Sequence, residues 1–410
     1  MDLNKLSLEM HKKKKGKLVI KSKVNVKNKL DLSIAYTPGV AEVCRKIADD
    51  PKEVYEYTIK KNTVAVVSDG SAVLGLGNIG AEASIPVMEG KCILMKEFAG
   101  IDAFPICVKT QKSDEIIELV KNIAPVFGGI NLEDISAPRC FEIEEKLQDI
   151  GIPVFHDDQH GTAVVALAAI INSAKIVNKK MKDLKIVING AGAAGIAVAK
   201  LLLCMGIDKK ICTRVKDIIL LDSKGAIHHC RDNLNEIKKV MAVNTNARCN
   251  NTKHNPKDKK CQSCIKGGLK EAITGTDVFI GVSVANILTK EMVKSMNKDS
   301  IILAMANPIP EIMPNQAKEA GAAIVGTGRS DFPNQINNVL AFPGIFKGAL
   351  EAGAVRINHE MKIAAAYALA VCQKNPTPKK ILPEPFDENV AKKVSEAVKK
   401  TAIETGAVRK

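Results

Sequence analysis

The chain has 410 residues, a formal net charge of +15, eleven Cys and no Trp. Its length suggests two or three domains, and no apolar run is long enough to span a membrane, so we expect no membrane partner. Aromatic residues make up only 3% of the chain, which argues against stacking on nucleic-acid bases, and scattered cysteines without a secretory signal favour reduced thiols in a cytoplasmic enzyme.

The net charge is concentrated in two stretches. Residues 1–30 hold ten Lys against Asp2 and Glu9, which gives +8, and residues 237–270 hold nine Lys or Arg against Asp258, which again gives +8. The two sum to +16, so the rest of the chain carries −1. A nucleic-acid-binding fold spreads basic residues over its working face, so we interpret both stretches as solvated segments and expect no nucleic-acid partner.

The first half of the chain alternates predicted strands and helices. A basic arm at residues 1–30 precedes a turn at Pro38-Gly39, and a buried strand at 63–68 leads through a glycine loop to a helix containing Pro86 and Met88. Further strands are expected at 91–96, 103–108 and 130–136, and further helices at 43–47, 114–123 and 140–150. This alternation predicts a mostly parallel sheet.

The second half continues the pattern, with a helix at 161–177 and strands at 185–189, 217–222, 278–282, 300–305 and 322–326. We predict an α/β protein with an N-terminal α/β catalytic domain at residues 31–160 and a Rossmann-type doubly wound NAD(P)-binding domain at residues 161–345. Residues 346–410 are predicted to form helices that pack back on the catalytic domain. Residues 244–268 form a polar insert rich in Cys and Lys.

A glycine motif follows the strand at 185–189. In Gly190-Ala-Gly-Ala-Ala-Gly195, the first Gly permits a tight turn, the second lets a pyrophosphate approach the backbone, and the third lets the helix pack closely. Asp222 ends the next strand, where an acid that binds ribose is expected. Asp222 favours NAD, whereas the nearby Lys224 could hold the 2′-phosphate of NADP, so both cofactors stay open. The similar Gly75-Leu-Gly-Asn-Ile-Gly80 lacks such an acid and is interpreted as a turn that faces a small anion, with a second nucleotide site as the alternative.

Three carboxylates stand at the ends of two predicted strands: Glu133, Asp134 and Asp158. An all-oxygen ligand set suits Mg²⁺ or Mn²⁺ rather than Zn²⁺. Solvated or capping acids are the alternative interpretation, because paired acids are common on protein surfaces. Taken alone, Tyr36 beside its turn and Lys91 could likewise be a packing residue and a surface residue.

The insert carries a possible zinc site. Cys249, His254, Cys261 and Cys264 supply the three thiols and one imidazole of a structural zinc centre, although only Cys261 and Cys264 have tight spacing. The alternative is a polar loop with incidental thiols.

Seven motifs in this order give the chain a resemblance to malic enzymes of the short bacterial type, from about residue 30 to 400. They are Ala35-Tyr-Thr-Pro-Gly-Val40, Ser68-Asp-Gly-Ser-Ala-Val-Leu-Gly-Leu-Gly77, Met88-Glu-Gly-Lys91, Asn131-Leu-Glu-Asp134, Phe155-His-Asp-Asp-Gln-His-Gly-Thr162, Gly190-Ala-Gly-Ala-Ala-Gly195 and Asn337-Asn-Val-Leu-Ala-Phe-Pro-Gly344. The resemblance implies oxidative decarboxylation of (S)-malate to pyruvate and CO₂, with NAD or NADP and Mg²⁺ or Mn²⁺.

The resemblance also assigns roles to residues. It makes Lys91 the general base and Tyr36 the general acid, with Asp157 beside Lys91. The metal ligands that it implies are Glu133, Asp134 and Asp158. The cofactor contacts that it implies are Gly190, Gly192, Ala193, Ala194, Gly195, Asp222 and Asn307, and Asn307 and Asn338 match substrate contacts.

One departure from the family concerns the malate carboxylates. Long animal-type members have an Arg in the loop before the Leu-Gly-Leu-Gly motif, and here that loop is Gly70-Ser-Ala72. The loop at Leu74 and Gly75, with backbone N–H groups of residues 75–77, is our candidate for carboxylate binding together with Asn307 and Asn338.

Two other functions stay open from the residues alone. A non-decarboxylating hydroxy-acid dehydrogenase would not need the acid pair Glu133-Asp134. A nucleotide-sensing or nucleic-acid-binding protein on the same fold would use the basic arm, and the complete catalytic set argues against it. Because the arm at residues 1–30 has too few apolar residues to pack alone and leads directly to Tyr36, we expect a homodimer in which the arm lies on the partner.

Overall fold

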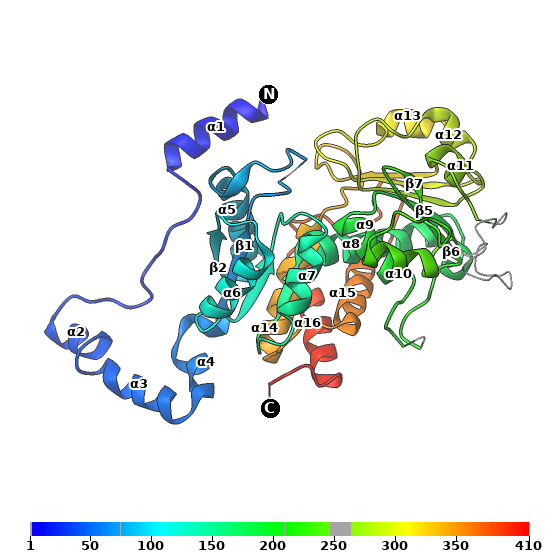
Figure 1. The fold of residues 1–410 in the computed structure, drawn as a ribbon. Coiled ribbons are helices and arrows are strands. Elements are labelled where there is room, and N and C mark those ends of the chain that lie inside the picture. The colour runs from blue at the N-terminus through cyan, green and yellow to red at the C-terminus, as the bar shows by residue number, and fades with distance from the viewer. Residues whose placement is uncertain (1, 74, 209, 247–263, 410) are drawn as a thin grey trace.

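The computed structural model describes residues 2–73, 75–208, 210–246 and 264–409. They form two α/β units with three C-terminal helices beneath them, and an N-terminal segment that reaches away from the rest (Figure 1). The first unit contains a four-stranded parallel sheet of order β2-β1-β3-β4. Its strands are β1 (Thr63–Ser68), β2 (Asp102–Cys107), β3 (Gly129–Leu132) and β4 (Val154–His156), and its helices are α5 (Gly80–Ala99), α6 (Ser113–Ile123) and α7 (Arg139–Lys146).

The second unit is the doubly wound sheet that the sequence predicts. Its order is β10-β9-β8-β5-β6-β7, and only the short edge strand β7 runs antiparallel to its neighbour. The strands are β5 (Lys185–Asn189), β6 (Asp217–Asp222), β7 (Gly225–Ala226), β8 (Val278–Gly281), β9 (Ile301–Ala304) and β10 (Ile324–Thr327). The helices are α8 (Asp157–Ile176), α9 (Ala193–Leu202), α10 (Glu236–Asn244), α11 (Leu269–Ile273), α12 (Lys290–Lys294) and α13 (Pro314–Glu319). The predicted α/β fold class is confirmed.

Helix α8 joins the two units through the core. Its side chains are buried on nearly all sides, which is typical of a helix that packs against several neighbours. The C-terminal helices are α14 (Phe342–Ala352), α15 (His359–Cys372) and α16 (Glu388–Glu404). Helix α15 packs on α8, while α14 and α16 both contact α5 of the first unit. The C-terminal helices therefore support both sides of the region between the sheets.

The strand predicted at residues 91–96 is wrong, because this segment belongs to the 20-residue helix α5. Pro86 and Gly90 interrupt the run and suggest a break, and residues 92–95 are all apolar. The buried positions nevertheless recur at helical spacing. They are Ala81, Ser84, Met88, Cys92, Met95 and Ala99. This correction matters for function, since Lys91 lies on a rigid helix rather than at the end of a strand.

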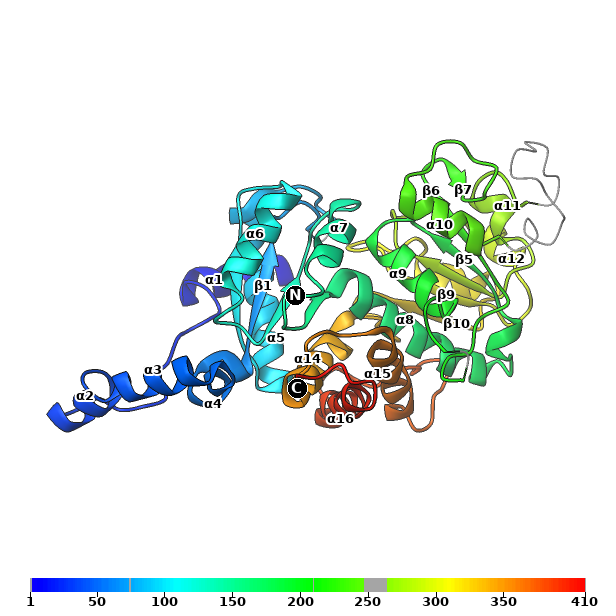
Figure 2. The same cartoon turned by 60° about the horizontal axis from the view of Figure 1, so that its bottom comes forward.

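The N-terminal segment contains four helices and makes few contacts with the rest of its own chain. Helices α1 (Leu3–Lys14), α2 (Lys29–Ala35), α3 (Val40–Asp49) and α4 (Val54–Tyr57) contain no buried residue. Figures 1 and 2 both show α2 and α3 standing away from the two sheets. Two lysines tie the segment to the first unit. Lys17 donates from its backbone N–H to Glu89 and from Nζ to the backbone oxygen of Pro86, and Lys23 Nζ lies 3.9 Å from Asp102 Oδ2.

The structure tests two expectations drawn from the composition, those about the cysteines and about membrane spans. Cys204 and Cys212 form a disulfide with a Cα–Cα distance of 5.9 Å, so the expectation of reduced thiols is wrong for this pair. The pair closes the turn after α9, a proximity that scattered positions in the sequence did not indicate. Among the described residues, no helix is both long and apolar enough to cross a membrane.

Candidate active site

Three carboxylates gather at the carboxyl end of the first sheet. Strands β3 and β4 are parallel neighbours, so Glu133 and Asp134, which follow β3, come beside Asp158 in the first turn of α8. One oxygen of each carboxylate lies within 4.8 Å of the other two. The backbone N–H of Asp134 donates to Asp158 Oδ2 over 2.8 Å. The structure thus brings the three predicted metal ligands together.

Burial makes this carboxylate set unfavourable without a compensating charge. Glu133 is 2% exposed and Asp134 5% exposed. Burial raises the pKa of Glu133 to about 7, and burial together with nearby Asp158 raises the pKa of Asp134 to about 9. Asp134 Oδ2 is buried and has no hydrogen-bond partner among the described residues. An unpartnered oxygen on an acid grouped with two further carboxylates fits a divalent cation with oxygen ligands.

Lys91 projects from α5 into the same cluster. Its Nζ lies 2.5 Å from Asp157 Oδ2, 2.9 Å from Glu133 Oε1 and 4.7 Å from the centre of the Phe342 ring. Burial alone would lower the pKa of Lys91, but the carboxylates of Asp157 and Glu133 outweigh it and raise the pKa above its ordinary value. Asp157 is fully buried, and burial raises its pKa to about 6. Lys91 is therefore an ammonium ion held between two acids.

Gly161 lets Asp157 and the C-terminal part of the chain approach each other. A Cβ at Gly161 would collide with Asp157 Oδ1 and would lie 3.1 Å from Cβ of Asn338. Asn338 begins the 3-10 helix η5 (Asn338–Leu340), which leads directly into α14. The structure thus places the predicted substrate residue Asn338 beside the Lys91–Asp157 pair.

Arg139 fixes the loop that follows β1, and the sequence analysis did not single it out. Its guanidinium donates to Asp69 Oδ2 over 2.7 Å, to Ser71 Oγ over 2.9 Å and to the backbone oxygen of Gln111 over 2.7 Å. Arg139 lies 70 positions from Asp69, so no local motif reveals the contact. The loop continues toward Leu74, a predicted substrate residue that lies outside the described residues.

The same loop touches the second unit at Asn307. Gly75 has a φ of 74°, and a side chain there would collide with the backbone oxygen of Asn307. Glu311 holds the backbone next to Asn307 in place. Its buried carboxylate accepts hydrogen bonds from the backbone N–H groups of Ser283 over 3.0 Å and Ala306 over 3.1 Å. The two predicted contacts Gly75 and Asn307 are thus adjacent, and Glu311 is a positioning residue that the sequence analysis missed.

The glycine motif has the geometry of a phosphate-binding turn. Gly190 has a φ of 120°, and a Cβ at Gly195 would collide with the backbone oxygen of Gly190. A Cβ at Gly192 would meet nothing within 4 Å, so the backbone there is open to a ligand. Ala193 and Ala194 follow in the first turn of α9, whose N-terminus favours an anion.

Asp222 lies at the end of β6, as expected, but two cations hold it. Arg231 donates to both carboxylate oxygens over 3.0 and 2.9 Å, and Lys238 Nζ donates to Oδ2 over 2.7 Å. Burial alone would raise the pKa of Asp222, but the hydrogen bonds from Arg231 and Lys238 outweigh it and lower the pKa to about 2. Sequence spacing did not indicate either partner. The end of β6 therefore combines an acid with two cations.

Tyr36 is the predicted residue that the structure does not bring to this site. It follows α2 as its C-cap residue and is 67% exposed. Figures 1 and 2 show α2 far from α5, the helix that contains Lys91. Within one chain, the described site has a candidate base but lacks the expected acid.

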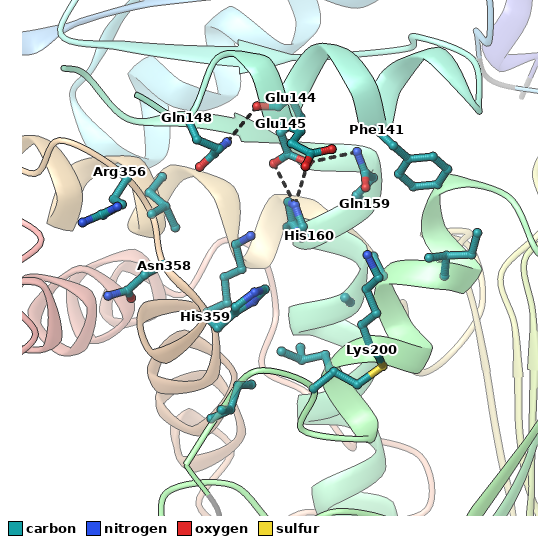
Figure 3. A pocket seen from close by; sticks show the side chains of 18 of the residues that line it. Phe141, Glu144, Glu145, Gln148, Gln159, His160, Lys200, Arg356, Asn358 and His359 are labelled. Atoms are coloured by element: carbon teal, nitrogen blue, oxygen red, sulfur yellow. Dashed lines mark hydrogen bonds and ion pairs between the residues drawn. The ribbon is translucent and has the colours of Figure 1, made fainter. Parts of the chain in front are cut away.

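A cavity of about 390 Å³ lies behind the first turn of α8, between α7, α9 and the start of α15 (Figure 3). Glu144 closes one wall, since it accepts from Gln159 Nε2 over 3.1 Å and lies 2.7 Å from His160 Nε2. Lys362 is 7% exposed, and within the described part of the chain its Nζ makes no hydrogen bond or ion pair. Burial lowers the pKa of Lys362 to about 8.

The zinc set predicted in the insert is mostly beyond what the structure describes. Cys249, His254 and Cys261 lie outside the described residues. Cys264 is described, and it lies beside His228 and Cys230, which the sequence analysis did not connect with it.

Known proteins match the whole chain. Residues 159–403 match the family described as "Malic enzyme, NAD binding domain", and residues 13–113 and 109–148 match "Malic enzyme, N-terminal domain". The bifunctional malic/malolactic enzyme of Bacillus subtilis is 56% identical, with 100% of this chain and 95% of that protein covered. The NAD-dependent malic enzyme of Geobacillus stearothermophilus is 54% identical, with 96% of this chain and 78% of that protein covered.

Solved structures agree with this assignment. The NAD-dependent malic enzyme of Thermotoga maritima has a TM-score of 0.87 at 48% identity, and the alignment covers 96% of this chain and 98% of that one. The malic enzyme of Pyrococcus horikoshii has a TM-score of 0.89 at 43% identity, over 99% and 92% of the two chains. With both family domains matched in order and close relatives aligned along its whole length, this chain belongs to the malic enzyme family.

Proposed function

We propose that this protein oxidises malate with NAD or NADP and decarboxylates the product to pyruvate and CO₂, with Mg²⁺ or Mn²⁺ as its metal. The observation that carries the proposal is the convergence of Lys91 on the carboxylate set of Glu133, Asp134 and Asp158. A simple hydroxy-acid dehydrogenase needs a base and a dinucleotide site, but it has no use for three buried carboxylates beside the base. The names of the relatives point the same way.

Lys91 takes the proton of the C2 hydroxyl as hydride leaves C2 for the nicotinamide. As an ammonium ion Lys91 cannot accept this proton, so the negative charges that raise its pKa must first be offset. A divalent cation held by Glu133, Asp134 and Asp158 would supply that charge, and it would also stabilise negative charge on the C2 oxygen of the substrate. Asp157 orients the Lys91 amine through their 2.5 Å contact.

Substrate binding falls to groups around this pair. The backbone N–H groups of Gly75 and Gly77 lie in the loop that leads into the N-terminus of α5. These N–H groups suit a malate carboxylate. Asn307 and Asn338 border the same space and bind the substrate and the nicotinamide ring in this proposal.

The dinucleotide lies over the glycine turn. Gly190, Gly192 and Gly195, with Ala193 and Ala194, hold the pyrophosphate at the N-terminus of α9. If Arg231 and Lys238 move away from Asp222, its carboxylate can accept a hydrogen bond from the adenosine ribose, which favours NAD. If they stay, the same two cations would attract the 2′-phosphate of NADP. Both cofactors remain in the proposal, and steady-state kinetics with each one decides between them.

Tyr36 acts in the neighbouring subunit of a homodimer. Apolar side chains along the N-terminal segment are exposed: Leu3, Leu6, Leu8, Val19, Ile20, Val24, Leu30, Leu32, Ile34 and Tyr36. So much exposed apolar surface is unfavourable in water and marks an interface. A second copy of the chain is the partner that would both cover this surface and complete a site that lacks its acid, since a two-fold dimer exchanges equivalent segments. The protein acts in the cytoplasm in this proposal.

The test combines purified enzyme, malate, Mn²⁺ and each dinucleotide in turn. The proposal expects dinucleotide reduction that depends on Mn²⁺ and is lost in Lys91→Ala. The Bacillus relative is named as both malic and malolactic, so lactate is measured as well. Lactate without net dinucleotide reduction would indicate the malolactic reaction instead, and reduction that ignores Mn²⁺ would indicate a plain dehydrogenase.

A further inference from the structure

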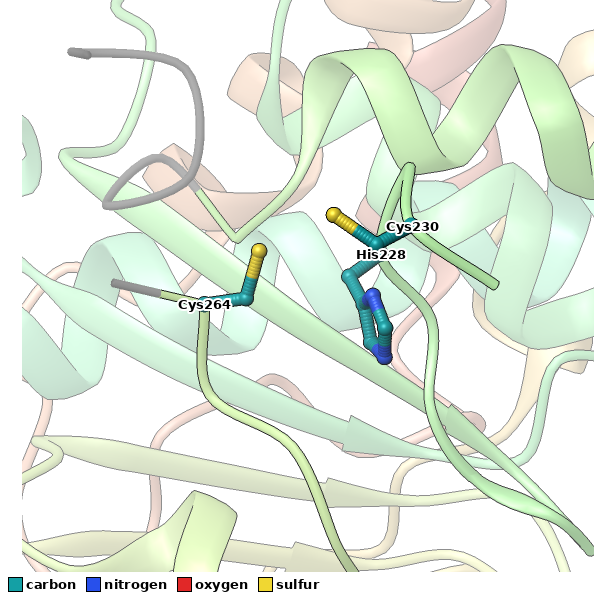
Figure 4. A group of neighbouring side chains, drawn as sticks. All are labelled: His228, Cys230 and Cys264. Atoms are coloured by element: carbon teal, nitrogen blue, oxygen red, sulfur yellow. The ribbon is translucent and has the colours of Figure 1, made fainter. Parts of the chain in front are cut away.

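A second group of metal-binding side chains lies far from the active site, at the outer edge of the six-stranded sheet. His228 and Cys230 follow β7, and Cys264 stands at the start of the segment that returns to the sheet (Figure 4). One ligand atom from each residue lies within 4.8 Å of the other two. His228 and Cys264 are each 8% exposed. Two sulfurs and one imidazole therefore lie close together, with His228 and Cys264 buried and Cys230 partly buried.

The backbone brings these segments together independently of the three side chains. The N–H of Ala226 in β7 donates to the oxygen of Gly267 over 2.8 Å. Asn246 accepts from the N–H of Ile265 over 3.1 Å and donates to the oxygen of Ile265 over 2.8 Å. The chain is thus folded back on β7 by its own hydrogen bonds, and this fold fixes the approach of Cys264 to Cys230.

His228 gives a separate sign that a ligand is needed. Its Nδ1 atom is buried and has no hydrogen-bond partner within the described residues. A buried nitrogen without a partner costs free energy, which a metal bond would remove.

We propose that His228, Cys230 and Cys264 bind one structural zinc ion at the edge of the dinucleotide-binding sheet. Thiolate sulfur and imidazole nitrogen are the ligands that zinc prefers, whereas Mg²⁺ and Mn²⁺ prefer the oxygen set of the active site. The three side chains leave the fourth position of a tetrahedral zinc to a water molecule or another ligand. The ion would stabilise this edge of the sheet, where a strand of two residues provides little packing.

A disulfide is the competing state, because Cys264 is disulfide-bonded in this structure. A sulfur cannot be a disulfide and a zinc thiolate at the same time, so the zinc site belongs to the reduced protein. The disulfide leaves the buried nitrogen of His228 without a partner, whereas zinc uses the histidine as well. The experiment must therefore compare the two states directly.

The proposed ion has a consequence for the dinucleotide site, which rests on the proposed function. Arg231 is the next residue after Cys230, and its guanidinium holds both oxygens of Asp222. It also donates to the backbone oxygens of Gly225 over 3.1 Å and Ala226 over 3.3 Å. Zinc on Cys230 would therefore keep Arg231 in place at the end of β6. Loss of the ion should weaken dinucleotide binding more than it slows turnover.

The experiment measures zinc in the full-length protein, purified with a phosphine reductant and then dialysed. We expect near-unit zinc in the wild type and in the control Cys372→Ser, which removes a free thiol on α15. Cys230→Ser and Cys264→Ser should each lose most of the zinc, and Asp158→Asn should keep it, which separates this ion from the active-site metal. The KM for the dinucleotide should rise about three- to tenfold in Cys230→Ser, with kcat within about twofold.

A second measurement needs no variant. Cobalt(II) added to the reduced, zinc-free wild type should give the intense visible and near-ultraviolet bands of tetrahedral cobalt thiolate, and zinc should abolish them. Zinc-free wild-type protein that gives no such bands would overturn the proposal, as would unchanged zinc in both cysteine variants. A disulfide at Cys264 that survives the reductant, with no metal bound, would also overturn the proposal. None of these readouts depends on malate turnover, so failure here is distinct from failure of the proposed enzyme activity.

Discussion

Lys91 is the residue whose charge state decides whether the proposed chemistry can begin. It is held between Asp157 and Glu133, and these acids stabilise its protonated form. Tyr36, the proposed acid, is needed only when the enolate gains a proton at C3. The two residues therefore act at different ends of the reaction, and their variants should fail at different steps.

Lys91→Ala should reduce malate oxidation by about 10²–10⁴-fold, the usual contribution of a general base, and should reduce decarboxylation of added oxaloacetate less. Tyr36→Phe should slow the late step and increase release of the enol relative to pyruvate. Lys96→Ala is the matched control, because Lys96 is a half-exposed lysine on the same helix. Stopped-flow and product assays on both substrates make the comparison. Equal losses on both substrates in both variants would mean that the two residues act as one unit.

Asp158→Asn keeps the side-chain volume but removes a charged metal ligand. Activity should fall steeply, and the Mn²⁺ concentration for half-maximal activity should rise, because one of three carboxylates is lost. Asp183→Asn, at an exposed carboxylate on the second unit, is the matched control. A Mn²⁺ titration that is unchanged in Asp158→Asn would remove this residue from the metal site.

At the scale of single residues, the sequence predicted site residues that belong to recognisable motifs. It missed residues whose role depends only on contacts between distant segments. Glu133, Asp134 and Asp158 could be paired in advance, since strand ends in a parallel sheet lie at one edge. Arg139 and Glu311 could not, because each depends on contacts between segments that no local pattern relates. Both missed residues position loops of the candidate site.

At the scale of helices and strands, local signals predicted most elements but failed at α5. The run from Gly80 to Ala99 contains Pro86 and Gly90, which indicate breaks, and only its burial pattern reveals a continuous helix. The strands of the second sheet were easier, because each is a short apolar run between turn residues. The extent of α5 matters here, since it carries Lys91.

Helix α15 contains a buried lysine that offers a stability test. Burial lowers the pKa of Lys362 from 10.5 to about 8, so at pH 7 the folded protein bears the cost of a buried charge. Lys362→Met keeps the length of the side chain and should raise the free energy of unfolding at pH 7 by about 1–3 kcal/mol. Chemical denaturation at several pH values measures the gain.

The pH dependence has a defined sign. Between pH 8 and 10.5 the unfolded chain keeps a proton on Lys362 that the folded chain has lost, so the stability of the wild type rises with pH. The advantage of Lys362→Met should therefore shrink over this range and nearly vanish above it. A gain that is the same at pH 7 and above pH 10.5 would contradict the buried-charge explanation. Glu144→Gln is a useful comparison, because it removes the carboxylate that attracts Lys362.

For the whole molecule, the N-terminal segment decides how many chains form one active site. The basic arm was predicted from composition, but its separation from the body became visible only in the structure (Figure 2). The sequence suggested that this arm lies on a partner chain, but only the structure shows which apolar side chains, such as Val19 and Ile20, are exposed there.

Mixing two inactive variants tests the shared site. Tyr36→Phe and Lys91→Ala homodimers each lack one group in every site. After dissociation and reassociation, a mixed dimer should regain one complete site, which gives about a quarter of wild-type activity in a one-to-one mixture. Activity that stays at the level of the parent variants would place Tyr36 in the site of its own chain. Deletion of residues 1–25 should also weaken the dimer, which sedimentation can measure.

The central claim is that one site both oxidises malate and removes its carboxyl group. The direct measurement is the stoichiometry of a single reaction with purified enzyme, malate, Mn²⁺ and the preferred dinucleotide. We expect pyruvate, CO₂ and reduced dinucleotide in equal amounts throughout the time course. Reduced dinucleotide that accumulates with oxaloacetate and without CO₂ would contradict the account.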